Sequence, residues 1–166
     1  AKFWKLDEDD VVALHWTLFL YGVTSEARRR IAARLMMPRR LTDALLQLDM
    51  LREALQQLPA LDRPGDIVTL LEPLTSPLLA AGWLLAETED VKDKFLRYWT
   101  TWRHVQPLLT GADLKALGFP PGPLYRRMLE TLRFAQLNGE IETRDDALGL
   151  VRALVAEHAD AGPDVT

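Results

Sequence analysis

Apolar residues recur at helical spacing along this chain, and that periodicity is what most constrains its fold. Val91, Phe95, Tyr98, Trp102 and Val105 lie at positions i, i+4, i+7, i+11 and i+14. This spacing puts the five side chains in one stripe along an α-helix. The pattern predicts a helix through all five residues, with the stripe packed in the core.

Comparable patterns predict further helices, and no segment shows the alternation of a good strand. The expected fold class is therefore all-α, an irregular array of about eight or nine short helices without a sheet. The further helices are expected at residues 8–21, 26–36, 39–58, 66–72, 75–88, 111–117, 123–138 and 144–158.

Capping residues support the limits of several of these helices. Ser25 precedes an apolar-periodic segment and is its expected N-cap. Thr110 with Asp113, and Thr143 with Asp146, place a hydroxyl three residues ahead of a carboxylate, a shortened form of the capping box. Each pair predicts the start of a helix.

The segment LPALDRPGD is the weakest seam in the chain, because two prolines and a glycine interrupt the helical pattern. We expect two helical lobes that meet there. The N-terminal lobe would span residues 1–62 and the C-terminal lobe residues 63–158, followed by a frayed terminus at residues 159–166. A chain of 166 residues is long enough for one compact domain or two small ones.

Composition excludes some classes of protein. The chain has no cysteine, which excludes disulfides, thiolate metal sites and a cysteine nucleophile. Its longest apolar runs are about half of the roughly 20 residues that a membrane helix needs, and its charged start has no signal-peptide form. We therefore expect a cytoplasmic location and no membrane partner.

Basic residues gather in two islands although the net charge is −4. Arginines 28, 29, 30, 34, 39 and 40 form the first island without an intervening acid. It either binds phosphates or forms a solvated helix face in which Glu26 pairs with Arg29 or Arg30. The second island runs from Arg97 to Arg133, where six basic residues face only two acids.

No motif for catalysis or for a metal is present. The chain lacks GxSxG, GxGxxG and a phosphate-binding GKS or GKT loop, and His15, His104 and His158 have no partner in a metal-binding pattern. The acidic residues 7–10 open a predicted helix, where they complement the helix dipole. We predict no catalytic residue and no metal ligand in this chain.

Two linked motifs carry a resemblance to a known family. LTGADLKALGFPPGP contains T-G-x-D-L-x-x-L-G-x-x-P-G-P, and AQLNGEIETRDD fits A-x-L-(D/N)-G-x-I-x-T-(R/K)-(D/E)-(D/E). Together they resemble the C-terminal signature of bacterial tRNA nucleotidyltransferases and related poly(A) polymerases. A looser match places Arg34 and Leu35 in an R-L pair, so the resemblance covers about residues 12–156. The residues expected to form the structural motif are Gly111, Asp113, Leu114, Gly118, Pro121, Gly122, Pro123 and Gly139.

That family carries catalysis in an N-terminal head built on a β-sheet, followed by helical regions that help to hold the RNA. The resemblance implies that this chain is a noncatalytic C-terminal region without a cofactor of its own. The parent's head would use Mg²⁺ and a nucleoside triphosphate, and the partners would be that head and tRNA or another structured RNA. Addition of CCA, of the terminal A alone, or of a poly(A) tail stays open.

The hinge segment, residues 110–123, is where contact with RNA is expected. A helix that begins with Pro123 presents free N–H groups to phosphate, Gly122 permits close approach, and Lys115 and Arg127 flank the turn. Arg126 stands where many family members have glycine. Trp99, at the edge of the apolar stripe, is more available than Tyr98 or Trp102 to stack on a base. The candidate RNA-binding residues are Arg39, Arg40, Arg103, Lys115 and Arg127.

Three alternatives remain at this point. The glycines and prolines of the hinge segment can serve only to let two helices fold back. The whole chain can be a helical scaffold that docks the catalytic head or forms a homodimer without touching RNA. A DNA-binding hairpin is less favoured, because the hinge segment lacks tight G-x-G spacing.

Overall fold

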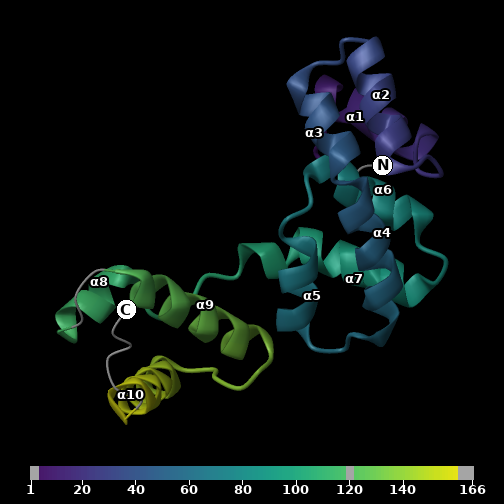
Figure 1. The fold of residues 1–166 in the computed structure, drawn as a ribbon. Helices are drawn as coiled ribbons and strands as arrows, with labels where there is room; N and C mark the ends of the chain where they lie inside the picture. The colour runs from purple at the N-terminus through teal and green to yellow at the C-terminus, as the bar shows by residue number, and fades with distance from the viewer. Residues whose placement is uncertain (1–3, 119–121, 161–166) are drawn as a thin grey trace. The chain divides into compact units, whose positions relative to one another are not determined.

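The computed structural model describes residues 4–118 and 122–160 (Figure 1). Every regular element in these ranges is a helix and none is a strand, which confirms the all-α prediction. Pro121 of the expected motif lies outside the described residues. So does the expected frayed terminus, apart from residues 159 and 160, which end the last helix.

The chain forms two compact units. The first contains Ala1–Asp62 and Asp66–Arg103, and the second contains Arg63–Gly65 and His104–Thr166. This division differs from the expected boundary between residues 62 and 63. The segment from 66 to 103 joins the first unit because its helices pack on that unit's N-terminal helices, a tertiary contact that sequence punctuation does not record.

Seven α-helices and two short 3₁₀ turns make up the described chain from residue 4 to 104 (Figure 1). Their bounds are α1 Glu8–Phe19, α2 Ser25–Arg34, α3 Arg39–Leu46, α4 Leu48–Gln57, η1 Leu58–Ala60, α5 Pro64–Leu71, α6 Ser76–Leu85, α7 Glu89–Thr100 and η2 Trp102–His104. Helix α1 packs against α3 and α6, and α6 in turn packs against α4 and α7.

The single helix expected at residues 39–58 is wrong, because the chain bends at Gln47 into α3 and α4. Gln47 keeps a helical φ of −80° while its ψ opens to −2°. The apolar stripe runs through the bend without a change of spacing. The bend lets α3 face α1 and α2 while α4 faces α6, so one stripe serves two different partners.

The core of the first unit lies where α4, α6 and α7 meet. Leu51 and Phe95 are fully buried there. Gly82 on α6 has no room for a side chain, because a Cβ at this position would collide with the Phe95 ring and lie 2.9 Å from Leu51 Cδ1. A residue with no side chain therefore sets how closely α6 approaches its neighbours.

The helix that contains Val91, Phe95 and Tyr98 is shorter than expected. These three residues are buried, but α7 ends at Thr100 and Val105 lies beyond η2. The Thr100 hydroxyl donates to the Leu96 carbonyl at 2.8 Å, a local bond that competes with continued helical pairing. The apolar spacing therefore continues past the end of the helix.

Thr24, rather than the expected Ser25, is the N-cap of α2. Its Oγ1 accepts a hydrogen bond from the Ala27 N–H at 3.4 Å, and Ser25 is the first helical residue. Both residues are good capping types, so sequence alone did not separate them.

Arg28 of the first basic island is buried rather than solvated. Its Nη1 donates to the Val23 carbonyl at 2.5 Å, and its Nη2 lies 2.7 Å from Asp49 Oδ1 on α4. Hydrogen bonding from Arg28 holds the pKa of Asp49 below its usual range. Arg52 reinforces this junction by donating to the carbonyls of Tyr21 and Val23. The α1–α2 turn is thus attached to α4.

The second unit contains α8 Gly111–Ala116, α9 Pro123–Leu137 and α10 Arg144–Asp160. Helix α9 packs against both α8 and α10 (Figure 1). One apolar cluster joins the three helices: Leu109, Leu114, Met128, Leu132, Ala135, Ile141, Ala147 and Val151. Gly65 belongs to this unit, and its N–H donates to Asn138 Oδ1 at 2.9 Å.

No single helix among the described residues is long and apolar enough to cross a membrane. Helices α5 and α6 would qualify only as a pair, and they are bent by 118° where they meet.

Replacing Arg28 with alanine should destabilise the first unit by about 3 kcal/mol, because it removes a buried side chain, its hydrogen bond to Val23 and its ion pair with Asp49. Equilibrium unfolding in urea, compared with that of the unmodified chain, measures the effect. Arg29→Ala, at the exposed neighbouring position, is the matched control and should change stability by less than about 0.5 kcal/mol. Equal effects of the two substitutions would contradict a structural role for Arg28.

Candidate nucleic-acid interface

The hinge segment begins with a complete capping box. The Thr110 hydroxyl oxygen accepts from the Asp113 N–H at 3.3 Å, and Asp113 Oδ2 accepts from the Thr110 N–H at 2.7 Å. This reciprocal pair caps α8, as the sequence predicted. Leu114, the next motif residue, is fully buried and fastens the short helix to the apolar cluster.

An ion pair between Asp113 and Arg144 joins the two sequence motifs, which lie about thirty residues apart in the chain. Arg144 also donates through Nη1 to the Leu108 carbonyl at 3.4 Å. The Arg144 guanidinium, followed by the Thr110 N–H and hydroxyl, holds the pKa of Asp113 well below its usual range. One carboxylate therefore caps α8 and fixes the start of α10 beside it.

The second motif contains its own capping box. Asp146 Oδ2 accepts from the Thr143 N–H at 2.9 Å and from the Glu142 N–H at 3.2 Å, while the Asp146 N–H donates to Thr143 Oγ1 at 3.2 Å. The hydrogen bonds from Thr143, followed by that from Glu142, lower the pKa of Asp146. The predicted start of this helix is confirmed.

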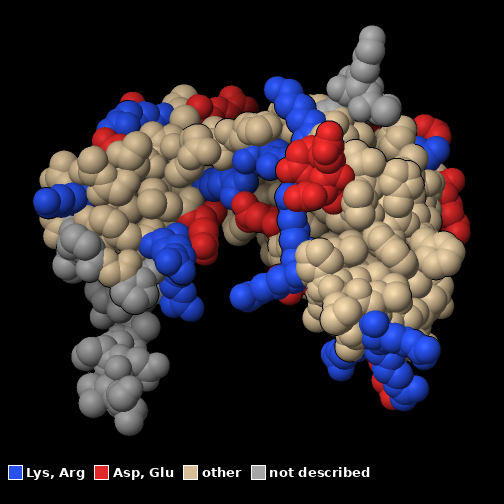
Figure 2. Space-filling model, turned by 90° about the horizontal axis from the view of Figure 1, so that it is seen from above, with Lys and Arg blue, Asp and Glu red and all other residues tan. Residues whose placement is uncertain are grey.

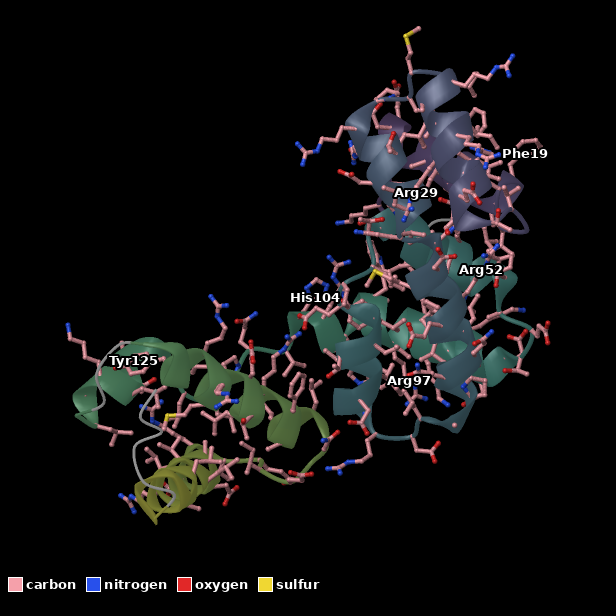
Figure 3. All side chains as sticks on the ribbon, in the orientation of Figure 1. Phe19, Arg29, Arg52, Arg97, His104 and Tyr125 are labelled. Carbon is pink, nitrogen blue, oxygen red and sulfur yellow. The ribbon has the colours of Figure 1, made fainter. Side chains whose placement is uncertain are left out.

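The glycines of the two motifs serve different purposes. Gly118 and Gly139 have φ angles of +91° and +71°, in the left-handed region that favours glycine. Gly122 is extended at φ 174°, which any residue adopts, and a Cβ there would meet nothing within 4 Å. A Cβ on Gly111 would make only ordinary contact with Tyr125. Tyr125 is labelled on α9 in Figure 3. Thus the backbone angles favour glycine at 118 and 139, whereas neither backbone angle nor packing requires it at 111 or 122.

Three cations lie in the hinge segment or just after it. Lys115 lies in the last turn of α8, and Arg126 and Arg127 lie in the first two turns of α9. All three are exposed, and within the described ranges none has an ion-pair partner. Pro123 is the first residue of α9, as predicted, and Gly122 caps that helix without a side-chain hydrogen bond. Pro123 has no N–H and the Tyr125 N–H donates to the Gly122 carbonyl at 3.0 Å, so the expected array of free N–H groups is reduced. Positive charge and the start of a helix are nevertheless close in sequence there.

Arg39 and Arg40, the candidates from the first island, have different surroundings. The Arg39 side chain is 95% exposed and lies 3.6 Å from Asp43, a long contact for an ion pair. Arg40 lies 3.1 Å from Asp7, 3.3 Å from Asp9 and 2.7 Å from Asp10. The acidic run that opens α1 therefore neutralises Arg40, which makes Arg39 the better phosphate contact of the two.

Arg103 stacks on an aromatic pair. Its guanidinium carbon lies 4.2 Å from the centre of the Trp99 ring, and Trp99 packs against Trp4 with ring centres 4.7 Å apart. Trp99 is half-buried in this stack. A cation over an aromatic face is held in place, and base stacking on that side of Trp99 would have to displace it.

Arg29 and Arg34 belong to the first island but were not among the candidate RNA-binding residues. Both are exposed and have no ion-pair partner in the part of the chain that the structure describes. Arg30 instead pairs with Glu26, one of the two pairings considered. Spacing alone did not distinguish the buried, paired and unpaired members of the island. In Figure 2 basic side chains gather in several separate groups with acidic groups among them.

Groups of histidine, aspartate and glutamate suited to a metal ion are absent from the described residues. His15 is exposed, and its Nδ1 lies 2.7 Å from the Val11 carbonyl of its own helix. His104 is exposed as well, and the side chain of His158 lies outside the described residues.

The chain is similar to two curated proteins, both A-adding tRNA nucleotidyltransferases. The one from Geobacter sulfurreducens is 37% identical over 86 residues, which is 52% of this chain and 10% of the relative. The one from Halalkalibacterium halodurans is 40% identical over 81 residues, 49% of this chain and 18% of the relative. The chain thus matches less than a fifth of each relative's length. No family model and no solved structure matches it. The resemblance expected from the motifs is confirmed.

Asp113→Asn should reduce the free energy of unfolding of the second unit at neutral pH. It should also make that free energy less dependent on pH in the acid range. The pKa of Asp113 is lower in the folded chain than in the unfolded chain, where it is near 3.8. The ionised carboxylate therefore stabilises the fold fully above the unfolded pKa, and this stabilisation is lost as the pH falls towards the folded pKa. Circular dichroism in urea at pH 7 and at steps from pH 5 to pH 2 measures both effects. Glu142→Gln, an exposed charge removal in the same unit, should leave the acid dependence unchanged.

Proposed function

We propose, from the similarity of about half of this chain to A-adding tRNA nucleotidyltransferases, that it is the noncatalytic RNA-binding region of such an enzyme. The observation that carries the proposal is the pair of cations at the hinge segment: Lys115 within it and Arg127 just after it are exposed and unpaired among the described residues. The two capping boxes and the Asp113–Arg144 ion pair hold α8 beside the start of α10.

The geometry supports contact with the RNA backbone. The start of α9 favours phosphate, because the positive end of the helix dipole attracts negative charge there. Gly122 leaves the approach open, since no described packing contact uses the space of a Cβ. Lys115 and Arg127 would then add charge-assisted hydrogen bonds. Such contacts read shape and charge rather than base identity.

The chemistry of nucleotide addition is assigned to a catalytic domain outside the 166 residues. Mg²⁺ and a nucleoside triphosphate would act in that domain, while this chain's residues hold the RNA so that its 3′ end can reach it. The named relatives make addition of a terminal A the favoured reaction of the parent enzyme, with CCA addition or poly(A) synthesis less favoured. A cytoplasmic location fits this role.

Reversing the charges of the hinge segment should weaken tRNA binding. Lys115→Glu with Arg127→Glu removes two phosphate contacts, and we expect a roughly tenfold or larger loss of affinity at moderate salt. Fluorescence anisotropy with labelled tRNA, repeated across a salt series, should also show the slope of log Kd against log salt reduced by roughly one per lost contact.

The control for these experiments is the double variant Lys5→Glu with Arg152→Glu. Both residues are exposed, and the pair changes the net charge by the same amount outside the hinge segment. Equal losses of affinity in the two double variants would contradict a specific contact at the hinge. An affinity that does not respond to salt would contradict the proposed function itself.

An apolar face on α1 favours a second candidate function, docking to the catalytic domain or to a second copy. Phe19, labelled in Figure 3, is 78% exposed, and Val12 is 49% exposed. Phe19, Trp16 and His15 line a cavity of about 360 Å³. A second cavity of about 400 Å³ is lined entirely by apolar residues: Trp4, Leu6, Val11, Leu14, Ala80, Trp83 and Leu84.

Phe19→Asp should abolish any self-association that uses the α1 face, because it places a charge at the centre of an apolar contact. Sedimentation velocity over a hundredfold range of protein concentration measures this self-association. A concentration-dependent dimer of the unmodified chain that is absent in Phe19→Asp would support the docking function. Phe19 is exposed, so the variant should keep the parent's unfolding midpoint. A monomer throughout would contradict self-association.

A further inference from the structure

The turn between α2 and α3 contains a residue in an unusual backbone conformation. Met36 has a φ of 47°, and it is the only residue other than glycine with a positive φ among those described. Its N–H donates to the Ala33 carbonyl at 3.2 Å, and the Met37 N–H donates to the Ala32 carbonyl at 3.0 Å. This is the pattern that ends many helices with a left-handed residue, and glycine is the usual choice there.

A methionine at this position is unfavourable for the folded chain in two ways. Its Cβ opposes the left-handed conformation, which glycine adopts without strain. Its side chain is also 88% exposed, so it contributes little packing in return. The preceding residue, Leu35, is 53% exposed. The fold therefore presents two neighbouring apolar side chains that its own packing does not explain.

Exposed arginines surround this apolar pair in the sequence. Arg34 is the last residue of α2 and Arg39 the first residue of α3, on either side of Met36. Arg29, labelled on the same unit in Figure 3, lies farther back on α2. Arg29 and Arg34 have no ion-pair partner in the described ranges, and Arg39 has only its long contact with Asp43.

We propose that this turn, the α2–α3 tip (residues 34–39 with Arg29), is a second RNA contact separate from the hinge segment. Met36 would lie on the face of an unpaired base, and Arg34 and Arg39 would bind the adjoining phosphates. A thioether is polarisable and packs favourably on aromatic rings, and every base offers such a face. Arginine forks match phosphate oxygens in two-point contacts. The inference rests on the proposed function.

RNA fits the tip better than the other partners that combine apolar and acidic groups. A stable protein interface buries roughly 800 Å² on each side, more than two apolar side chains and three arginines supply. Stable attachment to an anionic membrane needs a long apolar chain or a wide apolar face beside the positive charge. An unpaired nucleotide needs only one apolar surface and nearby cations.

Oxidation of methionine tests the proposal on the unmodified chain. Dilute hydrogen peroxide converts exposed methionine to the sulfoxide, and peptide mass spectrometry measures the rate at each position. Saturating tRNA should slow the oxidation of Met36 several-fold. Met50, 41% exposed on α4, is the internal control and should oxidise at an unchanged rate.

Met36→Gly provides an independent measurement, because it removes the side chain while keeping the backbone conformation. We expect the thermal midpoint to rise and the affinity for tRNA to fall roughly threefold to tenfold. Met50→Ala, the matched exposed substitution, should leave the affinity unchanged. The opposite directions of stability and affinity exclude a merely structural effect.

The outcomes separate this inference from the proposed function. Binding of tRNA that depends on Lys115 and Arg127, with Met36 neither protected nor needed for affinity, would overturn the inference alone. A chain that does not bind tRNA would overturn both. Protection of Met36 by vesicles of phosphatidylserine and phosphatidylcholine, without protection by tRNA, would assign the tip to a membrane and overturn the RNA contact.

Discussion

Asp113 is the residue on which the arrangement of the second unit depends. It accepts the Thr110 N–H at 2.7 Å and pairs with Arg144, so the entry to α8 and the start of α10 share one carboxylate. Partly exposed ion pairs contribute little to stability. The apolar cluster supplies most of the stability, and Asp113 adds a smaller share while it sets the local geometry. It fixes the start of α8, and with it the helix that carries Lys115.

Sequence patterns predicted the structure correctly where the interacting residues are close together in the chain. The capping boxes at Thr110 and Thr143 formed as predicted, because each joins residues three positions apart. Gly139 follows Asn138 in a turn and has a positive φ, which glycine adopts without strain. The bend at Gln47 had no such signal, since the apolar spacing is identical on both sides. Two different packing partners, α1 and α6, impose it.

The first basic island shows why spacing did not identify the site. Its arginines look alike in sequence, yet Arg28 is buried against Asp49, Arg40 is neutralised by three carboxylates, and Arg39 is 95% exposed. The partners of Arg28 and Arg40 come from other helices. Only the tertiary structure therefore separates arginines that hold the fold from arginines that can meet a ligand. The same holds for Met36, whose exposure no pattern of neighbouring residues reveals.

The net charge of −4 argues against RNA binding only if charge is spread evenly, and it is not. Asp7, Asp9 and Asp10 all converge on Arg40, and Asp113 is committed to Arg144. Acids held in such pairs contribute little repulsion beyond a Debye length of about 8 Å. Cations without ion-pair partners among the described residues include Lys115, Arg126 and Arg127 around the hinge segment, and Arg29 and Arg34 near the α2–α3 tip. A phosphate group near either place meets local positive charge, whatever the sum over the chain.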